Sequence, residues 1–232
     1  MSLRTSKKND KVIFDKDEMN ALTDIISQLS IQTENNKKPL IILGPSGVGK
    51  DTIINMFLKK YPEIFYKLVS FTTRKIREGE KEGIDYFYIT KEKFQEKKNE
   101  NKLIGIQEYN DNFYASDKSK LEELMNKGEK IIILNYNIET ANKVKDELDF
   151  NCIAILPPSE DELRNRLKHR GTKPEELEKR MKNSLKEMKL INEANYIKFR
   201  VVNDDKNICF TKIENHIKEL YPNFFKDKSI IN

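Results

Sequence analysis

The stretch Pro39–Thr52, PLIILGPSGVGKDT, decides the fold. Its apolar run at 40–43 predicts a short buried strand, and the pattern that begins at Asp51 predicts a helix. A glycine-rich turn ending at Lys50 joins the two. Such a turn directs backbone N–H groups inward, the helix N-terminus adds partial positive charge, and the lysine reaches outer phosphates. The arrangement therefore predicts a phosphate-binding loop.

The spacing Gly44-x4-Gly49-Lys50 fits the P-loop, with one departure. Asp51 stands where a Ser or Thr usually contacts magnesium. A plain glycine turn between a core strand and a surface helix is the alternative interpretation. The strand and the helix both lie where a phosphate loop needs them, so phosphate binding is favoured.

Composition predicts a folded protein with a heavily charged surface. A chain of 232 residues can bury a real core, and 35% of its residues are charged against 37% hydrophobic. Lys and Arg number 43 against 38 Asp and Glu, and the two signs are interspersed, so the net charge of +5 does not indicate a nucleic-acid partner. The N-terminus MSLRTSKKND has no apolar segment of a signal peptide. The apolar runs are far shorter than the ~20 residues that span a bilayer. We therefore predict a cytoplasmic protein with no membrane contact.

The cysteines and histidines predict no metal centre. Cys152 and Cys209 lie in apolar runs without CxxC or zinc-ligand spacing, so we expect buried, reduced thiols. His169 and His216 lie far apart in sequence and have no neighbouring Cys or His.

Strand-like and helix-like segments alternate along most of the chain, which predicts an α/β protein with a parallel sheet and right-handed crossovers. The expected strands of the main sheet, besides 40–43, are 66–70, 130–134, 151–156 and 197–202. The expected helices are 15–32, 51–61, 91–98, 118–126, 138–148, 160–169, 174–195 and 208–221. A hairpin is expected from 103–109 and 112–115. These segments predict an N-terminal extension at 1–37, a core domain at 38–70 and 117–222, a β-rich lobe at 71–116, a helical lid at about 160–195 and a tail at 223–232.

A second informative stretch follows the strand expected at 66–70. Arg74 and Arg77 lie three residues apart among glycines, on a loop rather than a helix. Guanidinium groups bind phosphate oxygens in pairs, so the two arginines can converge on one anion. Two solvated surface arginines would be the simpler interpretation if the P-loop were absent.

The segment Thr72–Ile89, TTRKIREGEKEGIDYFYI, resembles the acceptor lobe of guanylate kinases, whose pattern is S-x-T-T-R-x-x-R-x-G-E-x-x-G-x-D-Y-x-F. The similarity continues through FYAS at 113–116, PPSEDELRNRLKHRGT at 157–172 and VVNDD at 201–205, and spans residues 38–220. The resemblance implies a P-loop kinase fold, with a parallel sheet flanked by helices, an inserted β-rich acceptor lobe and a helical lid. It also implies transfer of the γ-phosphoryl group of Mg-ATP to GMP or dGMP, a step of purine nucleotide metabolism.

The same resemblance implies roles for individual residues. The lid arginines Arg166, Arg170 and Arg180 would act with Lys50 in catalysis. ATP would be bound by Gly44, Pro45, Ser46, Gly47, Val48, Gly49, Lys50, Asp51, Thr52 and, near the adenine, Asn203. The GMP phosphate would be held by Ser70, Arg74, Arg77, Tyr86 and Tyr114, with Ser116 near the base. A monophosphate is already an anionic nucleophile, so no general base is expected.

Three acidic positions of the family pattern are neutral here. Gly105 stands where the family has a Glu that binds guanine, and strand alternation puts Gln107 on the same face with a weaker amide acceptor. The family's L-D-I-D becomes Leu134-Asn135-Tyr136-Asn137, which leaves Asn137 toward GMP and Asn135 toward the metal. We hypothesise that Asp51 is the magnesium ligand that supplies the charge Asn135 no longer carries.

Two alternatives remain open. A kinase with another phosphorylated acceptor is one, since ribose bisphosphate kinases share the G-P-S-G-x-G-K-D loop, although they lack the paired arginines Arg74 and Arg77. A catalytically silent guanylate-kinase-like binding module is the other, although such modules typically lose the loop lysine and lid arginines, which are present here. The favoured partners are ATP and GMP, with no nucleic acid and no membrane, for a monomer or alternatively a dimer.

Overall fold

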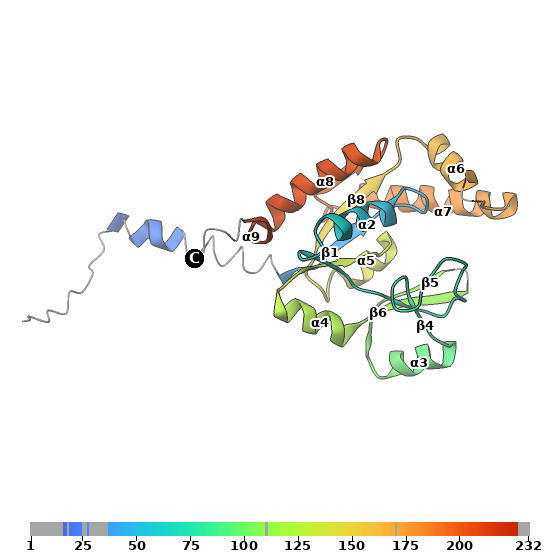
Figure 1. The fold of residues 1–232 in the computed structure, drawn as a ribbon, viewed down its shortest axis with the longest axis horizontal. Helices are drawn as coiled ribbons and strands as arrows, with labels where there is room; N and C mark the ends of the chain where they lie inside the picture. The colour runs from blue at the N-terminus through green and yellow to red at the C-terminus, as the bar shows by residue number, and fades with distance from the viewer. Residues whose placement is uncertain are drawn as a thin grey trace, which may run out of the picture.

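A computed structural model describes residues 16, 17, 19–24, 27, 37–109, 111–169 and 171–226. Its main sheet has five strands in the order β2-β7-β1-β8-β9, and every neighbouring pair is parallel (Figure 1). The parallel sheet predicted from the sequence is therefore confirmed. The strands are β1 (Leu40–Leu43), β2 (Phe65–Lys67), β7 (Ile131–Leu134), β8 (Asn151–Leu156) and β9 (Phe199–Val202).

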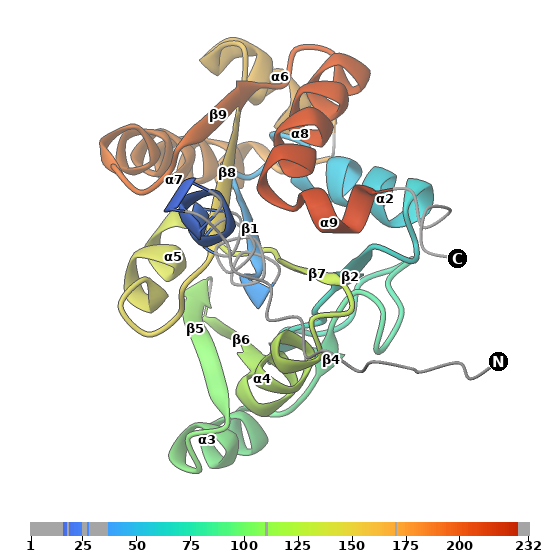
Figure 2. The same cartoon turned by 90° about the vertical axis from the view of Figure 1, so that its left-hand side faces the viewer.

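Helices cover both faces of this sheet, because the side chains of β1 alternate between two apolar clusters. Leu40 and Ile42 pack with α2 and α8, whereas Ile41 and Leu43 pack on the opposite side with α4, α5 and α7. Figure 2 shows α2, α8 and α9 on one side of the sheet and α5 and α7 on the other. These helices are α2 (Lys50–Lys60), α4 (Lys118–Lys127), α5 (Ile138–Val144), α6 (Glu160–His169), α7 (Pro174–Glu193), α8 (Lys206–Leu220) and α9 (Pro222–Phe225).

A second sheet of four strands lies beside the main one, in the order β4-β3-β6-β5. It packs with α3 (Lys91–Asn99) on a small core of its own, formed by Phe94, Leu103 and Ala115. Its strands are β3 (Phe71–Thr72), β4 (Phe87–Tyr88), β5 (Leu103–Tyr109) and β6 (Asn112–Asp117). The pairing of β5 with β6 confirms the predicted hairpin.

The structure corrects several predicted boundaries. The strand predicted at 66–70 ends at Lys67, because the chain leaves the main sheet after the Leu68 N–H bonds the Ile133 carbonyl, and it enters the second sheet at Phe71. The helix predicted at 138–148 ends at Val144, after which the chain forms a turn. Residues 223–225, expected in the tail, belong to α9, and its Phe224 and Phe225 pack on the core.

The N-terminal helix expected at 15–32 is described only in part. Residues 16, 17, 19–24 and 27 are helical, and the remainder of that prediction lies outside the described residues. The same holds for the final part of the predicted tail, 227–232.

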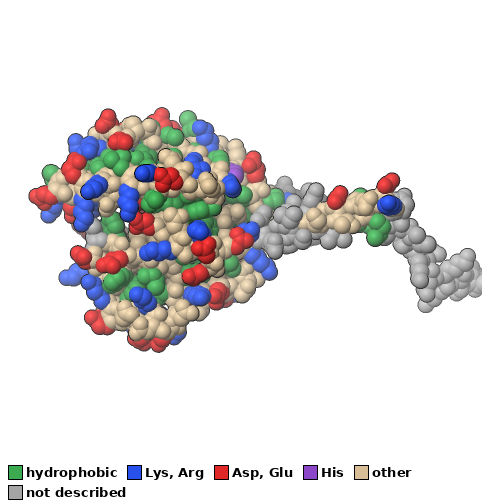
Figure 3. Space-filling view, turned by 180° about the vertical axis from the view of Figure 1, so that it is seen from behind, with side chains coloured by type: hydrophobic (Ala, Val, Ile, Leu, Met, Phe, Trp, Pro, Cys, Tyr) green, Lys and Arg blue, Asp and Glu red, His purple; other side chains and the backbone are tan. Residues whose placement is uncertain are grey.

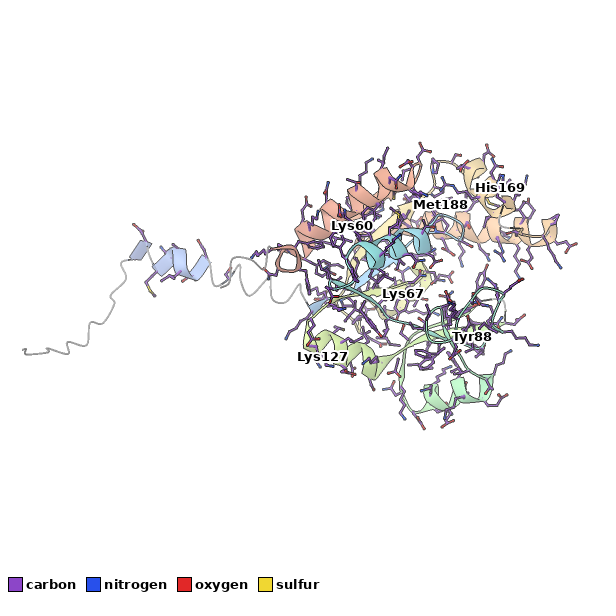
Figure 4. All side chains as sticks on the ribbon, in the orientation of Figure 1. Lys60, Lys67, Tyr88, Lys127, His169 and Met188 are labelled. Carbon is purple, nitrogen blue, oxygen red and sulfur yellow. The ribbon has the colours of Figure 1, made fainter. Side chains whose placement is uncertain are left out.

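A buried carboxylate joins α2 to α8. Lys60 Nζ lies 2.6 Å from Glu214 Oε1, and the Tyr61 hydroxyl donates to the same oxygen. Burial alone would raise the pKa of Glu214, but hydrogen bonds from Lys60 and Tyr61 outweigh it, and the pKa is lowered. Figure 4 labels Lys60 on this side of the molecule. The carboxylate is therefore bonded in its ionised form.

We expect Glu214→Gln to destabilise the fold by about 2 kcal/mol at neutral pH, since a buried acceptor of charge-assisted bonds is lost. A lowered folded pKa gives stability that is present above the usual carboxyl pKa and is lost as pH falls through the folded value, so the difference should narrow below about pH 4. Urea unfolding at two pH values measures this difference in the free energy of unfolding between Glu214→Gln and the unaltered protein. Glu123→Gln is the control, because Glu123 pairs with Lys120 and Lys127 in exposed positions that water screens. Equal losses for the two variants would contradict the assignment.

The charges on the surface and the positions of the two cysteines agree with what the sequence predicts. Lys and Arg are interspersed with Asp and Glu over the face that Figure 3 shows. Cys152 and Cys209 are free and buried, and burial raises the pKa of their thiols to about 12 and about 11. Within the described part of the chain, no helix combines the length and the apolar character that a bilayer span requires.

Candidate active site

The loop after β1 has the backbone of a phosphate cradle. Gly44, Gly47 and Gly49 have φ values of 148°, 88° and 102°, which L-residues with a side chain rarely adopt. A Cβ at Gly44 would also collide with the carbonyl of Ile155 on β8. Lys50 begins α2, and its Nζ donates to the carbonyls of Gly44 and, at 3.2 Å, Pro45. The predicted loop geometry is therefore present at the carboxyl end of β1.

A cleft of 360 Å³ opens between this loop, the second sheet and α7. In Figure 1, α6 and α7 lie on one side of this end of the molecule, and the second sheet with α3 lies on the other. Figure 4 labels Tyr88 on the second sheet, His169 at the end of α6, and Lys67 between them. The predicted site residues that line the cleft are Gly44, Ser46, Gly47, Gly49, Lys50, Asp51, Ser70, Arg74, Arg77, Tyr86, Gln107, Tyr114, Asn137 and Arg180.

A second hollow shares Gly47 and Gly49 with this cleft, and it is lined also by Val48, Thr52, Arg166 and Asn203. Asn203 Nδ2 donates to the Val48 carbonyl at 2.7 Å, and Arg166 Nη1 donates to the Asn203 carbonyl at 2.9 Å. The side chain of Val48 is buried in the core, so only its backbone faces a ligand. The structure thus separates Arg166 from Arg180, which sequence reasoning placed together.

Three further predicted residues have other positions. Pro45 is buried under the loop, and Ser116 is buried with its Oγ 3.3 Å from Ser70 Oγ. Arg170 lies outside the described residues.

Arg74 is fixed by a carboxylate that sequence reasoning did not single out. Its Nη2 and Nη1 lie 2.8 and 3.0 Å from the two oxygens of Glu80, and its guanidinium stands 5.4 Å from the centre of the Tyr86 ring. Glu80 also accepts from the Arg77 N–H and the Tyr88 hydroxyl, each at 2.8 Å. The hydrogen bond from Arg74 is the main cause that lowers the pKa of Glu80 to about 2. Glu80 therefore stays ionised and aligns Arg74 before any ligand binds.

The loop side and the lobe side of the cleft act on one another electrostatically. Burial, followed by the charge of Asp51, raises the pKa of Tyr86 to about 12, so its hydroxyl keeps its proton at neutral pH. On α7, burial raises the pKa of Glu187 while the charge of Lys50 opposes that shift. All four of these residues line the same cleft.

Asp51 and Asn135 lie in direct contact. Asn135 Nδ2 donates to Asp51 Oδ1 at 2.9 Å, which joins the two residues that the magnesium hypothesis links. No group of three or more His, Cys, Asp or Glu side chains in the described ranges could hold a metal ion. Magnesium commonly uses only one or two protein carboxylates and takes its other ligands from phosphates and water. The oxygens of this pair fit that donor set.

The wall opposite the loop is neutral. Gln107 Oε1 accepts from Thr140 Oγ1 at 3.2 Å, and Asn137 Oδ1 accepts from the Thr140 N–H at 2.8 Å as the cap of α5. Gly105 and Gln107 both line the cleft, as expected, but the alternation from which this was predicted is interrupted, because the register of β5 shifts between Ile104 and Gln107.

Sequence reasoning missed Glu80, Tyr136 and Glu187 as cleft residues. Glu80 belongs to the quoted acceptor motif, and Glu187 lies seven residues after Arg180 on the same helix face, so both had a signal. Tyr136 lies in the quoted segment 134–137, but its place beside Gly105 depends on a contact with a distant strand that the sequence does not show.

Comparisons with known proteins find similarity to one family. The guanylate kinase family profile matches residues 36–220. A guanylate kinase of Clostridium perfringens is 40% identical over 184 residues, which are 78% of this chain and 83% of that protein. A guanylate kinase of Clostridioides difficile is 37% identical, over 83% of this chain and 92% of its own. The crystal structure of guanylate kinase from Anaplasma phagocytophilum superposes with a TM-score of 0.63 at 28% identity, covering 78% of this chain and 85% of that one.

Proposed function

The chain belongs to the guanylate kinase family of ATP:GMP phosphotransferases, and we propose that its cleft transfers the γ-phosphoryl group of ATP to the phosphate of GMP. One observation carries the assignment to this cleft: the phosphate loop with Lys50 and the aligned guanidinium of Arg74 line the same space. One side suits a polyphosphate donor and the other a monophosphate acceptor. Since the acceptor is itself an anionic nucleophile, positioning and charge neutralisation suffice for the chemistry.

On the donor side, the backbone N–H groups of the loop and Lys50 hold the phosphates of ATP. Arg180 faces the same cleft from α7 and neutralises charge on the transferred group. The second hollow, with Arg166 and Asn203, takes the adenosine part of ATP. Gly47 and Gly49 line both the cleft and the second hollow, so one ATP molecule could extend from one into the other, which supports this division.

On the acceptor side, Arg74 and Arg77 bind the GMP phosphate together with Ser70, Tyr86 and Tyr114. Tyr86 is protonated at neutral pH and can donate a hydrogen bond, and the rise of its pKa to about 12 moves it further from ionisation. Gln107, Asn137 and the buried Ser116 lie toward the base. All of these residues except Ser116 line the cleft directly.

We infer that Asp51 and Asn135 contribute to a magnesium site shared with the ATP phosphates. Bound there, the ion would neutralise charge on those phosphates. The contact between the two side chains at 2.9 Å supports the inference.

Asp51→Asn tests the magnesium proposal. We expect the Mg²⁺ concentration for half-maximal activity to rise about tenfold, since one carboxylate contact is worth roughly 1.4 kcal/mol of ion binding. The Mg²⁺-dependent thermal stabilisation of the protein with ATP, measured without GMP, should shift by the same factor. Asp146→Asn is the control, because Asp146 is exposed and, among the described residues, forms its ion pair with the neighbouring Lys145. An unchanged Mg²⁺ requirement in Asp51→Asn would refute the metal role of Asp51.

A coupled assay of ATP consumption tests the function itself, with GMP, dGMP, AMP, UMP and ribose bisphosphate as acceptors. GMP and dGMP should give the highest kcat/KM. Turnover only with ribose bisphosphate would replace the proposal by the kinase alternative, and ATP binding without any turnover would favour the silent module. We also propose a cytoplasmic location, supported by two free, buried cysteines and by nucleotide substrates.

A further inference from the structure

Lys67 is a cationic side chain of the cleft that the proposed function leaves without a role. It ends β2, is half-buried and lines the cleft together with Lys50 and Arg74. Figure 4 labels it between the second sheet and α6. The acceptor motif does not include Lys67, because that motif begins at Ser70. Its role has to be inferred from its surroundings.

Strand pairing places Lys67 at the junction between the two sides of the cleft. Lys67 pairs with Ile133 of β7, two residues before Asn135. Asn135 in turn donates to Asp51 in the first turn of α2, on the side proposed for the donor. Ser70, on the side proposed for the acceptor, follows Lys67 by three positions. The strand end that carries Lys67 therefore lies between the groups proposed for ATP and those proposed for GMP.

The side chain of Lys67 lies on the face of the main sheet that α2 covers. Side chains alternate along a strand, so Lys67 shares this face with Phe65, which packs against Phe57 of α2. All strands of this sheet run parallel, and α2 begins at their carboxyl edge with Lys50. Lys67 lies two residues further toward that edge than Phe65, which agrees with its place on the wall of the cleft.

The ammonium of Lys67 has no counter-charge in the part of the chain that the structure describes. Arg74 pairs with Glu80, whereas Lys67 makes no hydrogen bond or ion pair with any described residue. The neighbouring strand offers the amide of Asn135 rather than a carboxylate. Asp51 also lines the cleft, but its Oδ1 accepts from Asn135. A half-buried cation without a partner favours an anionic ligand.

We propose that Lys67 binds the acceptor phosphate from the side that faces the phosphate loop. Arg74 and Arg77 hold the same phosphate from the segment after β3. As the acceptor phosphate approaches the γ-phosphoryl group of ATP, the two anions repel one another, and a cation between them offsets that repulsion. This inference rests on the proposed phosphorylation of GMP in the same cleft.

Lys67→Met tests the proposal, because it removes the charge and keeps most of the apolar stem. We expect the Kd for GMP, measured by calorimetry without ATP, and the KM for GMP each to rise about tenfold, since a charge-assisted contact is lost. The KM for ATP should stay within about twofold. Lys67→Arg keeps the charge, so its Kd for GMP should stay within about threefold of the unaltered value. Added KCl should weaken GMP binding less in Lys67→Met than in the unaltered protein.

Lys198→Met is the matched control. Lys198 directly precedes β9, is exposed and lies outside the cleft-lining residues, so its loss should leave the Kd for GMP unchanged. An unchanged Kd for GMP in Lys67→Met would overturn the proposal, as would equal losses in Lys67→Met and Lys67→Arg. Absence of GMP turnover by the unaltered protein would overturn the proposed function instead, so the two failures are distinguishable.

Discussion

Replacing Lys50 by methionine should lower kcat for phosphoryl transfer by about 10³-fold at saturating Mg-ATP and GMP. The ammonium lies at the loop that faces the acceptor side, and methionine keeps most of the apolar stem while it removes the charge. The transition state spreads negative charge over the transferred group, so a fixed cation there acts on kcat rather than on substrate binding alone. A coupled assay measures kcat, and circular dichroism confirms that the variant is folded.

The control for this substitution is Lys59→Met. Lys59 lies on the same helix and is exposed at its last turn, so its loss should leave kcat within about twofold. The KM for GMP should change little in Lys50→Met, because Arg74 and Glu80 are on the other side of the cleft. If kcat falls by less than tenfold in Lys50→Met, the role proposed for Lys50 is contradicted.

Arg74→Gln should lower kcat/KM for GMP by about 10²–10³-fold, with most of the loss in KM. The variant loses a charged contact to the phosphate, and it also leaves Glu80 without its cationic partner, with only the hydrogen bonds from the Arg77 N–H and the Tyr88 hydroxyl. The hydrogen bond from Arg74 is the main cause that lowers the pKa of Glu80, so without Arg74 this pKa would move back toward the ordinary carboxyl range. That range still lies well below neutral pH, so the carboxyl would stay ionised and would repel the substrate. The KM for ATP should remain within about threefold.

A double-mutant cycle separates these two effects. Glu80→Gln alone should cost about tenfold in kcat/KM, since Arg74 loses its bidentate partner. Arg74→Gln combined with Glu80→Gln should recover about tenfold relative to Arg74→Gln, because the repelling charge is gone. Strictly additive losses, or an equal rise in the KM for ATP, would contradict this account.

The parts of the fold predicted well from sequence were those set by local patterns. The strand β1 is buried on both faces, so its sequence is a continuous apolar run. The loop glycines adopt backbone angles that residues with a side chain rarely adopt. Both features can therefore be recognised within a few consecutive residues. The end of β2 was misjudged because apolar residues continue through Leu68 and Phe71, where the chain passes from one sheet to the other.

In the candidate site, too, local patterns identified residues but not the contacts between them. Motif spacing identified Arg74 and Arg77, but not that Glu80 holds one of them by its side chain and the other by its backbone. The lid arginines were grouped because the family resemblance implies the same role for them, whereas α6 and α7 direct Arg166 and Arg180 to different hollows. These arrangements depend on contacts between distant segments, which a pattern along the chain does not carry.

The side chain of the phosphate-loop lysine is hydrogen-bonded to the loop's own backbone. The Lys50 ammonium rests on the carbonyls of Gly44 and Pro45, so ATP can engage it only after those bonds are exchanged for bonds to phosphate oxygens. Arg74 is likewise engaged, by two hydrogen bonds to Glu80 and one to the Lys75 carbonyl at 2.7 Å. Under the proposed function, binding of either phosphate therefore competes with hydrogen bonds that the protein makes within itself.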